Sequence, residues 1–273
     1  AFFITFFPQL VAGPIVRAAD FIPQIKKKYS LTQEDFGRAV FLILTGLFKK
    51  VVISDFISVN FVDRVFDNPL SYSGFENLMG IYGYAIQIYC DFSGYSDMAI
   101  GIALLLGFHL PVNFASPYLA FSITEFWKRW HISLSTWLKD YLYIPLGGNR
   151  LGKVRTYINL LLTMLIGGLW HGASWNFVLW GVAHGAGISF VHAVRRFSLL
   201  GWLGRIPRTL KILVTFHFVI ACWILFRSPD LATAWRVASG PFVAPNGATS
   251  TFALQNIFQL ALIGVFMATH RWD

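Results

Sequence analysis

Residues 153–196 read KVRTYINLLLTMLIGGLWHGASWNFVLWGVAHGAGISFVHAVRR. Two apolar runs, 157–169 and 175–191, flank a glycine-rich segment at 167–172 that holds a histidine. Basic residues stand at both outer ends of these runs, namely Arg150, Lys153, Arg155, Arg195 and Arg196. Because short loops rich in Lys and Arg stay on the cytoplasmic side of a membrane, the pattern predicts a helical hairpin with both ends at that side and its tip at membrane depth.

The composition of the whole chain agrees with a membrane protein. Hydrophobic residues make up 56% of the 273 residues and charged residues only 13%, against about 25% charged residues in a soluble domain. Aromatic residues reach 17%, and a bilayer solvates such side chains whereas a soluble fold of this size has no place for so many. We therefore predict an all-α polytopic membrane protein with a single domain over residues 1–273. Because apolar runs meet both ends of the chain, we expect an internal fragment of a longer protein.

The basic residues are distributed as topology signals. The formal net charge is +9, from 22 Lys and Arg against 13 Asp and Glu. These residues form short clusters between apolar runs, at 26–28, 49–50, 128–129, 150–155, 195–196 and 205–211. Juxtamembrane charge has this distribution, whereas a nucleic-acid-binding domain gathers its basic residues on one face or helix. We therefore expect a lipid bilayer, and no nucleic acid, as a partner.

The first residues are expected to be irregular. Pro8 and the pair Gly13-Pro14 interrupt the apolar run at 1–16, since neither residue type continues a helix well. A more regular segment follows Thr32. With Asp35 three residues later, Thr32 forms a weak version of the capping box that starts helices.

The apolar run at 75–108 is too long for one crossing. As a single helix it would extend about 50 Å, which exceeds the hydrocarbon thickness of a bilayer. Polar residues lie near its middle, so we predict a break near Ser93-Gly94. Asp91 and Asp97 would then cap the broken helix ends or, alternatively, form a polar site at the break.

Residues 123–142 predict an amphipathic helix. One face of the helical wheel is apolar and rich in Trp; it comprises Ile123, Phe126, Trp127, Trp130, Leu134, Trp137, Leu138 and Tyr141. The opposite face is polar and comprises Glu125, Lys128, Arg129, Ser135, Thr136 and Lys139. Helices of this kind lie in the membrane interface. We expect this helix at the cytoplasmic interface, with His131 at the boundary of its two faces.

His171 is the sharpest chemical signal. About 24 Å of helix separates it from Arg155, so it is expected within the bilayer, where an ionisable side chain is costly and marks a functional site by default. The small residues around it permit close approach of a helix or a substrate. The alternative is a histidine that only hydrogen-bonds between helices. His131 gives a weaker signal, because an interfacial histidine needs no function.

Other residues give negative signals. The remaining histidines do not match the HxxxH or HExxH spacings of metal sites; they are His109, His184, His192, His217 and His270. We therefore predict no metal site, which disfavours a di-iron membrane hydroxylase. Cys90 and Cys222 each lie inside an apolar run and form no CxxC pair. No GxSxG nucleophile elbow is present.

Several motifs resemble those of one family. They are FPQLVAGP at 7–14, DFSGYSDMAIG at 91–101, SITEFWKRWHISLSTWLKDYLYIPLGGNR at 122–150, GGLWHG at 167–172 and WGVAHG at 180–185. These motifs are similar to those of membrane-bound O-acyltransferases of the bacterial alginate O-acetyltransferase type. The resemblance covers almost the whole chain and is densest between residues 89 and 185.

The resemblance implies a fold and a site. The fold would have many helices of uneven length around a tunnel, in a bacterial inner membrane that the chain crosses many times. Two histidines would be functional: His171 in the Trp-His-Gly motif and His131 in the Arg-Trp-His motif. The acyl donor would arrive from the cytoplasm and the acceptor would lie on the outer side. Periplasmic partner proteins would pass the acetyl groups on to the polymer.

The resemblance implies acetyl transfer to hydroxyls of an exopolysaccharide such as alginate. We expect acetyl-CoA or a thioester derived from it as donor, and no bound cofactor. His171 would act as general base toward the acceptor hydroxyl, and His131 would orient the acceptor or stabilise charge on the thioester carbonyl. Desolvation favours the neutral imidazole that a base needs. Lys128, Arg129 and Arg150 would bind the donor phosphates, unless they only set topology.

Other interpretations stay open. The acceptor can be another envelope polymer, through D-alanyl transfer to teichoic acid or acetylation of peptidoglycan or cellulose. A transporter or flippase is a rival of another class, since broken helices with intramembrane Asp residues occur there, although the chain has no inverted repeat. A scaffold without catalytic activity is the third alternative, and the presence of both histidines argues against it.

Overall fold

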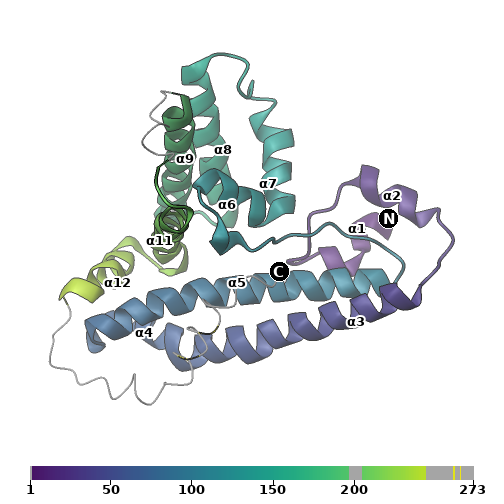
Figure 1. The fold of residues 1–273 in the computed structure, drawn as a ribbon, viewed down its shortest axis with the longest axis horizontal. Coiled ribbons are helices and arrows are strands. Elements are labelled where there is room, and N and C mark those ends of the chain that lie inside the picture. The colour runs from purple at the N-terminus through teal and green to yellow at the C-terminus, as the bar shows by residue number, and fades with distance from the viewer. Residues whose placement is uncertain (1, 197–204, 244–260, 262–264, 266–273) are drawn as a thin grey trace.

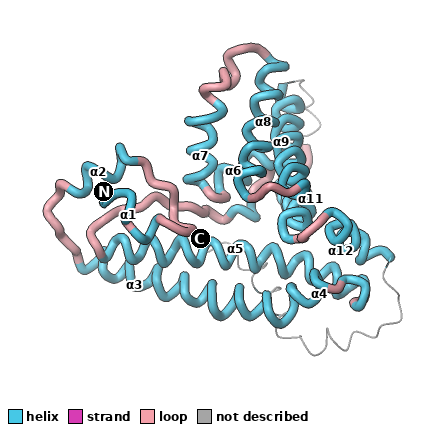
Figure 2. The backbone as a smooth tube through the Cα atoms, turned by 180° about the vertical axis from the view of Figure 1, so that it is seen from behind, coloured by secondary structure: helices cyan, strands magenta, loops and turns pink. Residues whose placement is uncertain are grey.

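The structure, a computed structural model, describes residues 2–196 and 205–243 together with Ala261 and Val265. Within these residues every regular element is a helix, which confirms the all-α prediction for this part of the chain (Figure 1, Figure 2). The apolar run at 252–268 lies almost wholly outside the described residues. The helices are α1 (Phe2–Thr5), η1 (Phe7–Gln9), α2 (Ala18–Ile25), α3 (Gln33–Leu47), η2 (Phe48–Asp55), η3 (Ser58–Val62), α4 (Asp63–Asp67), η4 (Pro69–Ser71), α5 (Gly74–Leu105), η5 (Pro117–Leu119), α6 (Ile123–Arg129), α7 (Ile132–Leu138), η6 (Lys139–Tyr143), α8 (Lys153–His171), α9 (Trp175–Arg196), α11 (Arg208–Arg227) and α12 (Leu231–Val243).

The start of the chain is irregular, as predicted. Helices α1 and η1 have only four and three residues. A Cβ atom on Gly13 would lie 2.1 Å from the backbone oxygen of Pro8, so only glycine permits this tight return of the chain. The first long helix, α3, begins after Thr32, whose side chain accepts a hydrogen bond from the Asp35 backbone N at 3.0 Å. The predicted cap is therefore confirmed.

Two long helical segments lie side by side in the lower part of Figure 1. α3 continues through the π-helical segments η2 and η3 into α4, and α5 returns beside them. α5 is unbroken for 32 residues, about 48 Å, so the predicted break near Ser93-Gly94 is wrong. A Cβ atom on Gly94 would lie 2.7 Å from the backbone oxygen of Gly46 in α3. The small residues therefore let two helix backbones approach closely and do not end the helix.

The two aspartates of α5 form ion pairs and cap no helix end. Lys49 Nζ lies 3.1 Å from Asp97 Oδ2. Lys50 Nζ lies 2.6 Å from Asp91 Oδ1 and 2.7 Å from Asp55 Oδ1. Because the helix has no break, both predicted roles, cap and polar site at a break, are wrong. The lysines that follow α3 instead neutralise carboxylates on α5, which makes the charges tolerable in an apolar environment.

We expect the variant Lys49→Met to be less stable than the double variant Lys49→Met/Asp97→Leu. The single change leaves the Asp97 carboxylate, 22% exposed, without this cation, whereas the double change removes both charges. Breaking a shielded pair costs more than replacing the pair by apolar side chains. Thermal unfolding of the purified full-length protein in detergent measures this difference, and a double variant that unfolds at the lower temperature would contradict it.

The predicted hairpin is present. α8 and α9 pack along their lengths and stand across the long pair of helices (Figure 1, Figure 2). The chain turns at residues 172–174, directly after His171. Two glycines bring the helix backbones together, since a Cβ atom on Gly168 would lie 2.3 Å from the backbone oxygen of Phe177 and 3.3 Å from the Cα atom of Gly181.

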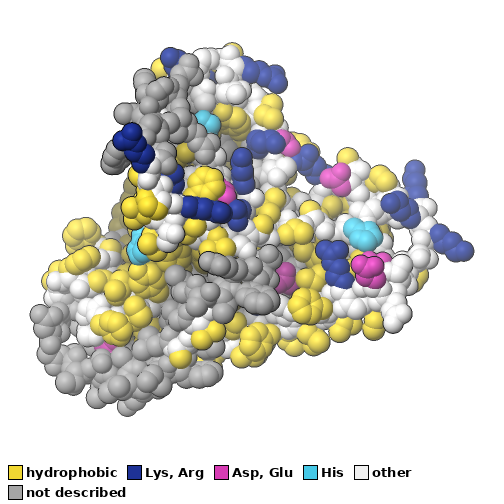
Figure 3. Space-filling model, viewed as in Figure 1, with side chains coloured by type: hydrophobic (Ala, Val, Ile, Leu, Met, Phe, Trp, Pro, Cys, Tyr) yellow, Lys and Arg dark blue, Asp and Glu magenta, His cyan; other side chains and the backbone are white. Residues whose placement is uncertain are grey.

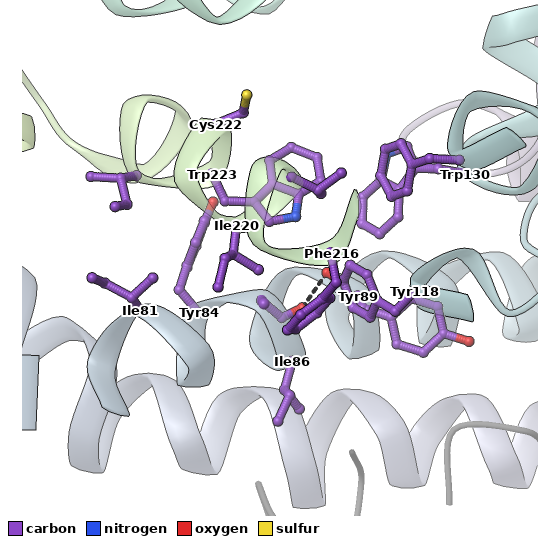
Figure 4. Packing of buried hydrophobic residues seen from close by; sticks show 14 of the residues in the cluster. Ile81, Tyr84, Ile86, Tyr89, Tyr118, Trp130, Phe216, Ile220, Cys222 and Trp223 are labelled. Carbon is purple, nitrogen blue, oxygen red and sulfur yellow. Dashed lines mark hydrogen bonds between the residues drawn. The ribbon is translucent and has the colours of Figure 1, made fainter. Parts of the chain in front are cut away.

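α11 joins the hairpin to the long pair of helices. It contacts both α9 and α5, and it is seen nearly end-on in Figure 1 and in Figure 2. Figure 4 shows Phe216, Ile220 and Trp223 of α11 facing Tyr84 and Tyr89 of α5. All five side chains are at most 6% exposed. The main core therefore lies where α11 meets the long helix α5 and the α8–α9 hairpin.

Two described helices are long and apolar enough to cross a membrane: Trp175–Val194 in α9 and Arg208–Arg227 in α11. Only 28% of the apolar stretch in α9 and 39% of that in α11 is buried in protein. Lipid can therefore solvate the rest of each helix. Figure 3 shows apolar side chains along the lower edge of the visible face. Basic side chains gather in its upper half and around the end that carries α2.

The predicted continuous helix at 123–142 is wrong. The segment forms α6, α7 and the π-helical turn η6, with a break at Trp130 and His131. Trp130 is extended, and His131 has a left-handed backbone with φ 44° and ψ 56°. The apolar side chains before and after the break are mostly buried in protein, with Ile123, Phe126, Trp127, Trp130, Leu134 and Leu138 each at most 8% exposed. Tertiary contacts therefore override the helical periodicity of this stretch.

Candidate active site

The break between α6 and α7 presents His131. The break occurs because backbone groups bond to a distant loop: Ile132 N donates to Asn113 O at 2.9 Å, and Ala115 N donates to Arg129 O at 3.0 Å. A left-handed backbone is uncommon for a residue with a Cβ atom, and these contacts hold it in place. The imidazole is 5% exposed and lies edge-to-face on Phe92, with ring centroids 4.6 Å apart.

A polar cluster surrounds the Nδ1 edge of His131. Nδ1 lies 3.1 Å from Asn113 Oδ1. The same oxygen accepts hydrogen bonds from Ser133 N at 3.2 Å and from Ser133 Oγ at 2.9 Å. Ser133 Oγ in turn accepts a hydrogen bond from Ile15 N at 2.9 Å. The irregular N-terminal segment therefore packs against the histidine turn.

His171 is the last residue of α8, at the tip of the hairpin. Its half-buried ring contacts aromatic rings of two helices. The centroid distances are 5.4 Å to Trp180 of α9 and 5.0 Å to Phe226 of α11. Among the described residues, no hydrogen bond to its ring nitrogens is found, so the predicted alternative of an interhelical hydrogen bond has no support.

His131 and His171 line one small cavity. Its volume is about 40 Å³, whereas one water molecule needs about 10–15 Å³. The other walls are apolar or aromatic and come from Ile88, Phe92, Trp127, Trp130, Leu134, Trp180, Trp223 and Phe226. The cavity therefore fits reacting groups of the size of an acetyl or a hydroxyl beside two imidazoles. In a cavity with such apolar walls each electrostatic contact is stronger than in water.

A third histidine lies next to this cavity without lining it. His184 is fully buried, and its Nδ1 accepts a hydrogen bond from Trp127 Nε1 at 3.2 Å. His184 therefore holds a cavity wall in place. His217, on α11, contacts the Tyr82 hydroxyl through Nε2 at 2.7 Å. In the described ranges no group of three His, Cys, Asp or Glu side chains is arranged to hold a metal ion, and His270 lies outside these ranges.

The three predicted phosphate-binding residues lie in different surroundings. Lys128 is exposed. Arg129 donates to Glu125 Oε1 at 2.7 Å and to the backbone oxygen of Ala115 at 3.4 Å. Arg150 lines a polar pocket of about 650 Å³ at the start of α8. The lining of that pocket includes neither Lys128 nor Arg129; its other members are Tyr143, Asn149, Gly152, Lys153, Thr156, Tyr157 and His192.

Another pocket, of about 530 Å³, lies beside the histidine turn. Ile132 and Ser133 line it together with Arg17 and Asp140, which form an ion pair between the N-terminal segment and η6. The hydrogen bond from the Arg17 guanidinium holds the pKa of the Asp140 carboxyl below its ordinary value. This ion pair therefore helps to hold the end of α7 against the N-terminal segment.

The sequence points to both histidines as candidates but gives no sign of the polar side chains that hold one of them. Asn113 lies in the loop between α5 and η5, and Ser133 lies in the first turn of α7. Neither has a local signal, because a polar residue in a loop or at a helix start is ordinary. The break in the helical pattern at His131 was also invisible in the sequence. Only the tertiary structure brings these residues together.

The sequence profile of the membrane-bound O-acyltransferase family matches residues 1–227. The chain is 46% identical over 253 residues to the peptidoglycan O-acetyltransferase of Helicobacter pylori, which covers 90% of this chain and 47% of that protein. It is 43% identical over 245 residues to the probable alginate O-acetylase AlgI of Azotobacter vinelandii, covering 89% of this chain and 47% of that protein.

A more distant similarity extends to another transferase. The chain is 28% identical over 244 residues to the teichoic acid D-alanyltransferase of Bacillus subtilis, covering 82% of this chain and 60% of that protein. The chain thus spans about half of the length of the two acetylating relatives.

Proposed function

The chain belongs to the membrane-bound O-acyltransferase family, and we propose that the protein containing it moves acetyl groups from a cytoplasmic thioester to hydroxyls of a cell-envelope polysaccharide. The relatives named as peptidoglycan O-acetyltransferase and alginate O-acetylase support this class of acceptor. An exopolysaccharide such as alginate is the first candidate, because of the relatives named alginate O-acetylase. Peptidoglycan is the second, because the relative with that substrate in its name is 46% identical to this chain.

One observation carries the proposal: His131 and His171 come from distant parts of the sequence and line the same apolar cavity. Among the described residues His171 makes no hydrogen bond, so a lone pair of its neutral ring is free to accept a proton. We assign His171 as general base toward the acceptor hydroxyl. The hydroxyl oxygen attacks the thioester carbonyl, an O–C bond forms and the C–S bond breaks. The proton passes from the hydroxyl through His171 to the departing thiolate.

The donor is proposed to be acetyl-CoA or a thioester made from it, entering by a tunnel from the cytoplasm. The pocket at the start of α8 supports an anionic donor, because Arg150 and Lys153 line it without an ion-pair partner in the described part of the chain. No residue in the first turn of α8 is acidic, so the partial positive charge of the helix start is not compensated there. By the positive-inside rule, this end of the hairpin faces the cytoplasm.

We expect the variants Arg150→Ala and Lys153→Ala to raise the KM for acetyl-CoA by roughly tenfold, with little change in kcat. Each removes one charge-assisted hydrogen bond to a phosphate that the ground state and the transition state share, worth about 1.5 kcal/mol. Initial rates at varied acetyl-CoA, measured in membranes, provide the test. Lys27→Ala, in the loop before α3, is the matched control and should leave the KM unchanged. Equal KM values for all variants would rule out this pocket as the phosphate site.

The proposal places the protein in a bacterial inner membrane with several crossings. Acetyl groups would leave on its outer side and reach the polymer with the help of periplasmic partner proteins. The experiment that tests the function is acetyl transfer by the full-length protein in isolated membranes. Labelled acetyl-CoA is supplied on the cytoplasmic side, and label is measured on alginate and on peptidoglycan separately. Membranes that lack the protein serve as the control. With the periplasmic fraction added to both, label on neither polymer would refute the proposal.

A further inference from the structure

The loop that carries Asn113 is bound closely to the histidine turn. Asn113 is 1% exposed. Its backbone oxygen accepts a hydrogen bond from Ile132 N, and Ala115 N two residues later donates to Arg129 O. The loop thus contacts the backbone on both sides of His131. This arrangement places the Asn113 side chain against the imidazole.

The orientation of the Asn113 amide follows from its neighbours. A backbone N–H only donates, so the atom that faces Ser133 N at 3.2 Å must be an acceptor. This atom is therefore Oδ1, and the amide nitrogen Nδ2 donates to Ser96 Oγ at 3.2 Å. A flipped amide would set two donors against each other at Ser133 N. The hydrogen-bond network thus fixes which end of the side chain meets His131.

The tautomer of His131 follows from this orientation. Its Nδ1 lies 3.1 Å from an oxygen that only accepts, so in the neutral ring Nδ1 carries the proton. Nε2 then keeps its lone pair on the edge of the ring away from Asn113. Because the His131 ring lines the cavity that His171 also lines, this lone pair is available to a group bound there.

We propose that Asn113 is a positioning residue that fixes the tautomer and the orientation of His131, so that Nε2 accepts a hydrogen bond from a hydroxyl of the acceptor. This inference rests on the proposed acetyl transfer. It also selects between the two roles predicted for His131. An Nε2 atom without a proton cannot donate to the thioester carbonyl, so His131 orients the acceptor, and charge that develops on the carbonyl is not stabilised by this ring.

The same side chain has a backbone role, which the test must separate from the role in positioning. Asn113 Oδ1 accepts from both the N–H and the hydroxyl of Ser133, and these bonds help to hold the left-handed backbone of His131. Leucine has nearly the shape of asparagine without its acceptor, whereas aspartate keeps an acceptor oxygen at the same place. The Ser96 hydroxyl, which donates to the Ala12 backbone oxygen at 3.5 Å, can rotate to donate to that carboxylate instead, so the contact between residues 96 and 113 survives in the aspartate variant.

We expect Asn113→Leu to lower the rate of acetyl transfer per folded protein about 10–100-fold, by analogy with the loss of groups that orient metal-binding histidines. Asn113→Asp should keep most of the activity. Rates are measured with the full-length protein in membranes and normalised to protein that is monodisperse in detergent. If Asn113→Leu does not accumulate, Asn113→Ala removes the same acceptor without added bulk. A leucine or alanine variant with a normal rate would overturn the proposal.

The decisive measurement is the rate of acetyl transfer by the double variant Asn113→Leu/His131→Ala. If Asn113 acts through His131, the double variant is as slow as His131→Ala alone, because coupled residues are not additive. Asn77→Leu is the matched control: Asn77 is also buried and donates to backbone oxygens, including that of Pro69 at 2.9 Å. Its effect should add to that of His131→Ala. An additive Asn113→Leu effect would overturn the inference alone, whereas a normal rate for His131→Ala would overturn the role of His131 in the proposed function.

Discussion

His171→Ala is expected to abolish acetyl transfer while the full-length protein stays in the membrane at normal abundance. Loss of a general base typically lowers a rate 10²–10⁴-fold, which removes polymer acetylation on the time scale of cell growth. The structural cost should be small, because the half-buried ring makes aromatic contacts to Trp180 and Phe226 but no hydrogen bond among the described residues. Acetate on the polymer, measured beside the amount of protein in the membrane, tests both expectations.

If His171 had only a structural role, the result would differ. An interhelical hydrogen bond in a membrane protein is worth about 0.6 kcal/mol, so its loss would lower stability slightly and leave the rate intact. His217→Ala is the matched control, because His217 contacts the Tyr82 hydroxyl and the Leu213 backbone oxygen, each at 2.7 Å, and does not line the cavity. This control should retain acetylation. Normal acetylation by His171→Ala at normal abundance would refute the assignment of His171 as a base.

The hairpin and its histidine were predictable because their signals are local. Two apolar runs, basic residues outside them and glycines between them define α8, α9 and their turn. A histidine in such a place needs no tertiary information to be noticed, since charge at membrane depth is costly. The cap at Thr32 was predictable for the same reason, because it involves residues three positions apart.

The features that were predicted wrongly depend on distant partners. Ser93 and Gly94 are residue types that often interrupt helices, yet α5 continues through them and Gly94 lets it approach α3. Asp91 is a residue type that often caps helices, yet it pairs with Lys50, which lies 41 positions earlier. The wheel at 123–142 is amphipathic throughout, yet Asn113 binds the backbone at Ile132 and ends the helix. Local patterns cannot distinguish these outcomes, since each depends on contacts that only the folded chain makes.

Gly181→Leu is expected to prevent the accumulation of folded protein. A Cβ atom on Gly181 would lie 2.5 Å from the backbone oxygen of Met164 and 3.0 Å from the Cα atom of Leu165. These are backbone atoms of α8, so no side-chain rotation relieves the clash, and α8 and α9 must separate. Overpacking a core typically costs about 1–3 kcal/mol when side chains can move, and the cost here should be at the upper end or beyond.

The helix that must move is the one that ends in His171, and Trp180 directly precedes Gly181 and contacts the His171 ring. Any Gly181→Leu protein that survives should therefore be inactive as well as scarce, unlike His171→Ala, which should be inactive at normal abundance. Gly37→Leu is the matched control, because no atom lies within 4 Å of a Cβ atom on Gly37 in α3, and leucine favours a helix over glycine by roughly 0.8 kcal/mol. Size-exclusion profiles in detergent should distinguish the Gly181→Leu protein from the Gly37→Leu protein. A monodisperse, abundant Gly181→Leu protein would show that α8 and α9 do not need this close approach, and the presentation of His171 would then require another support.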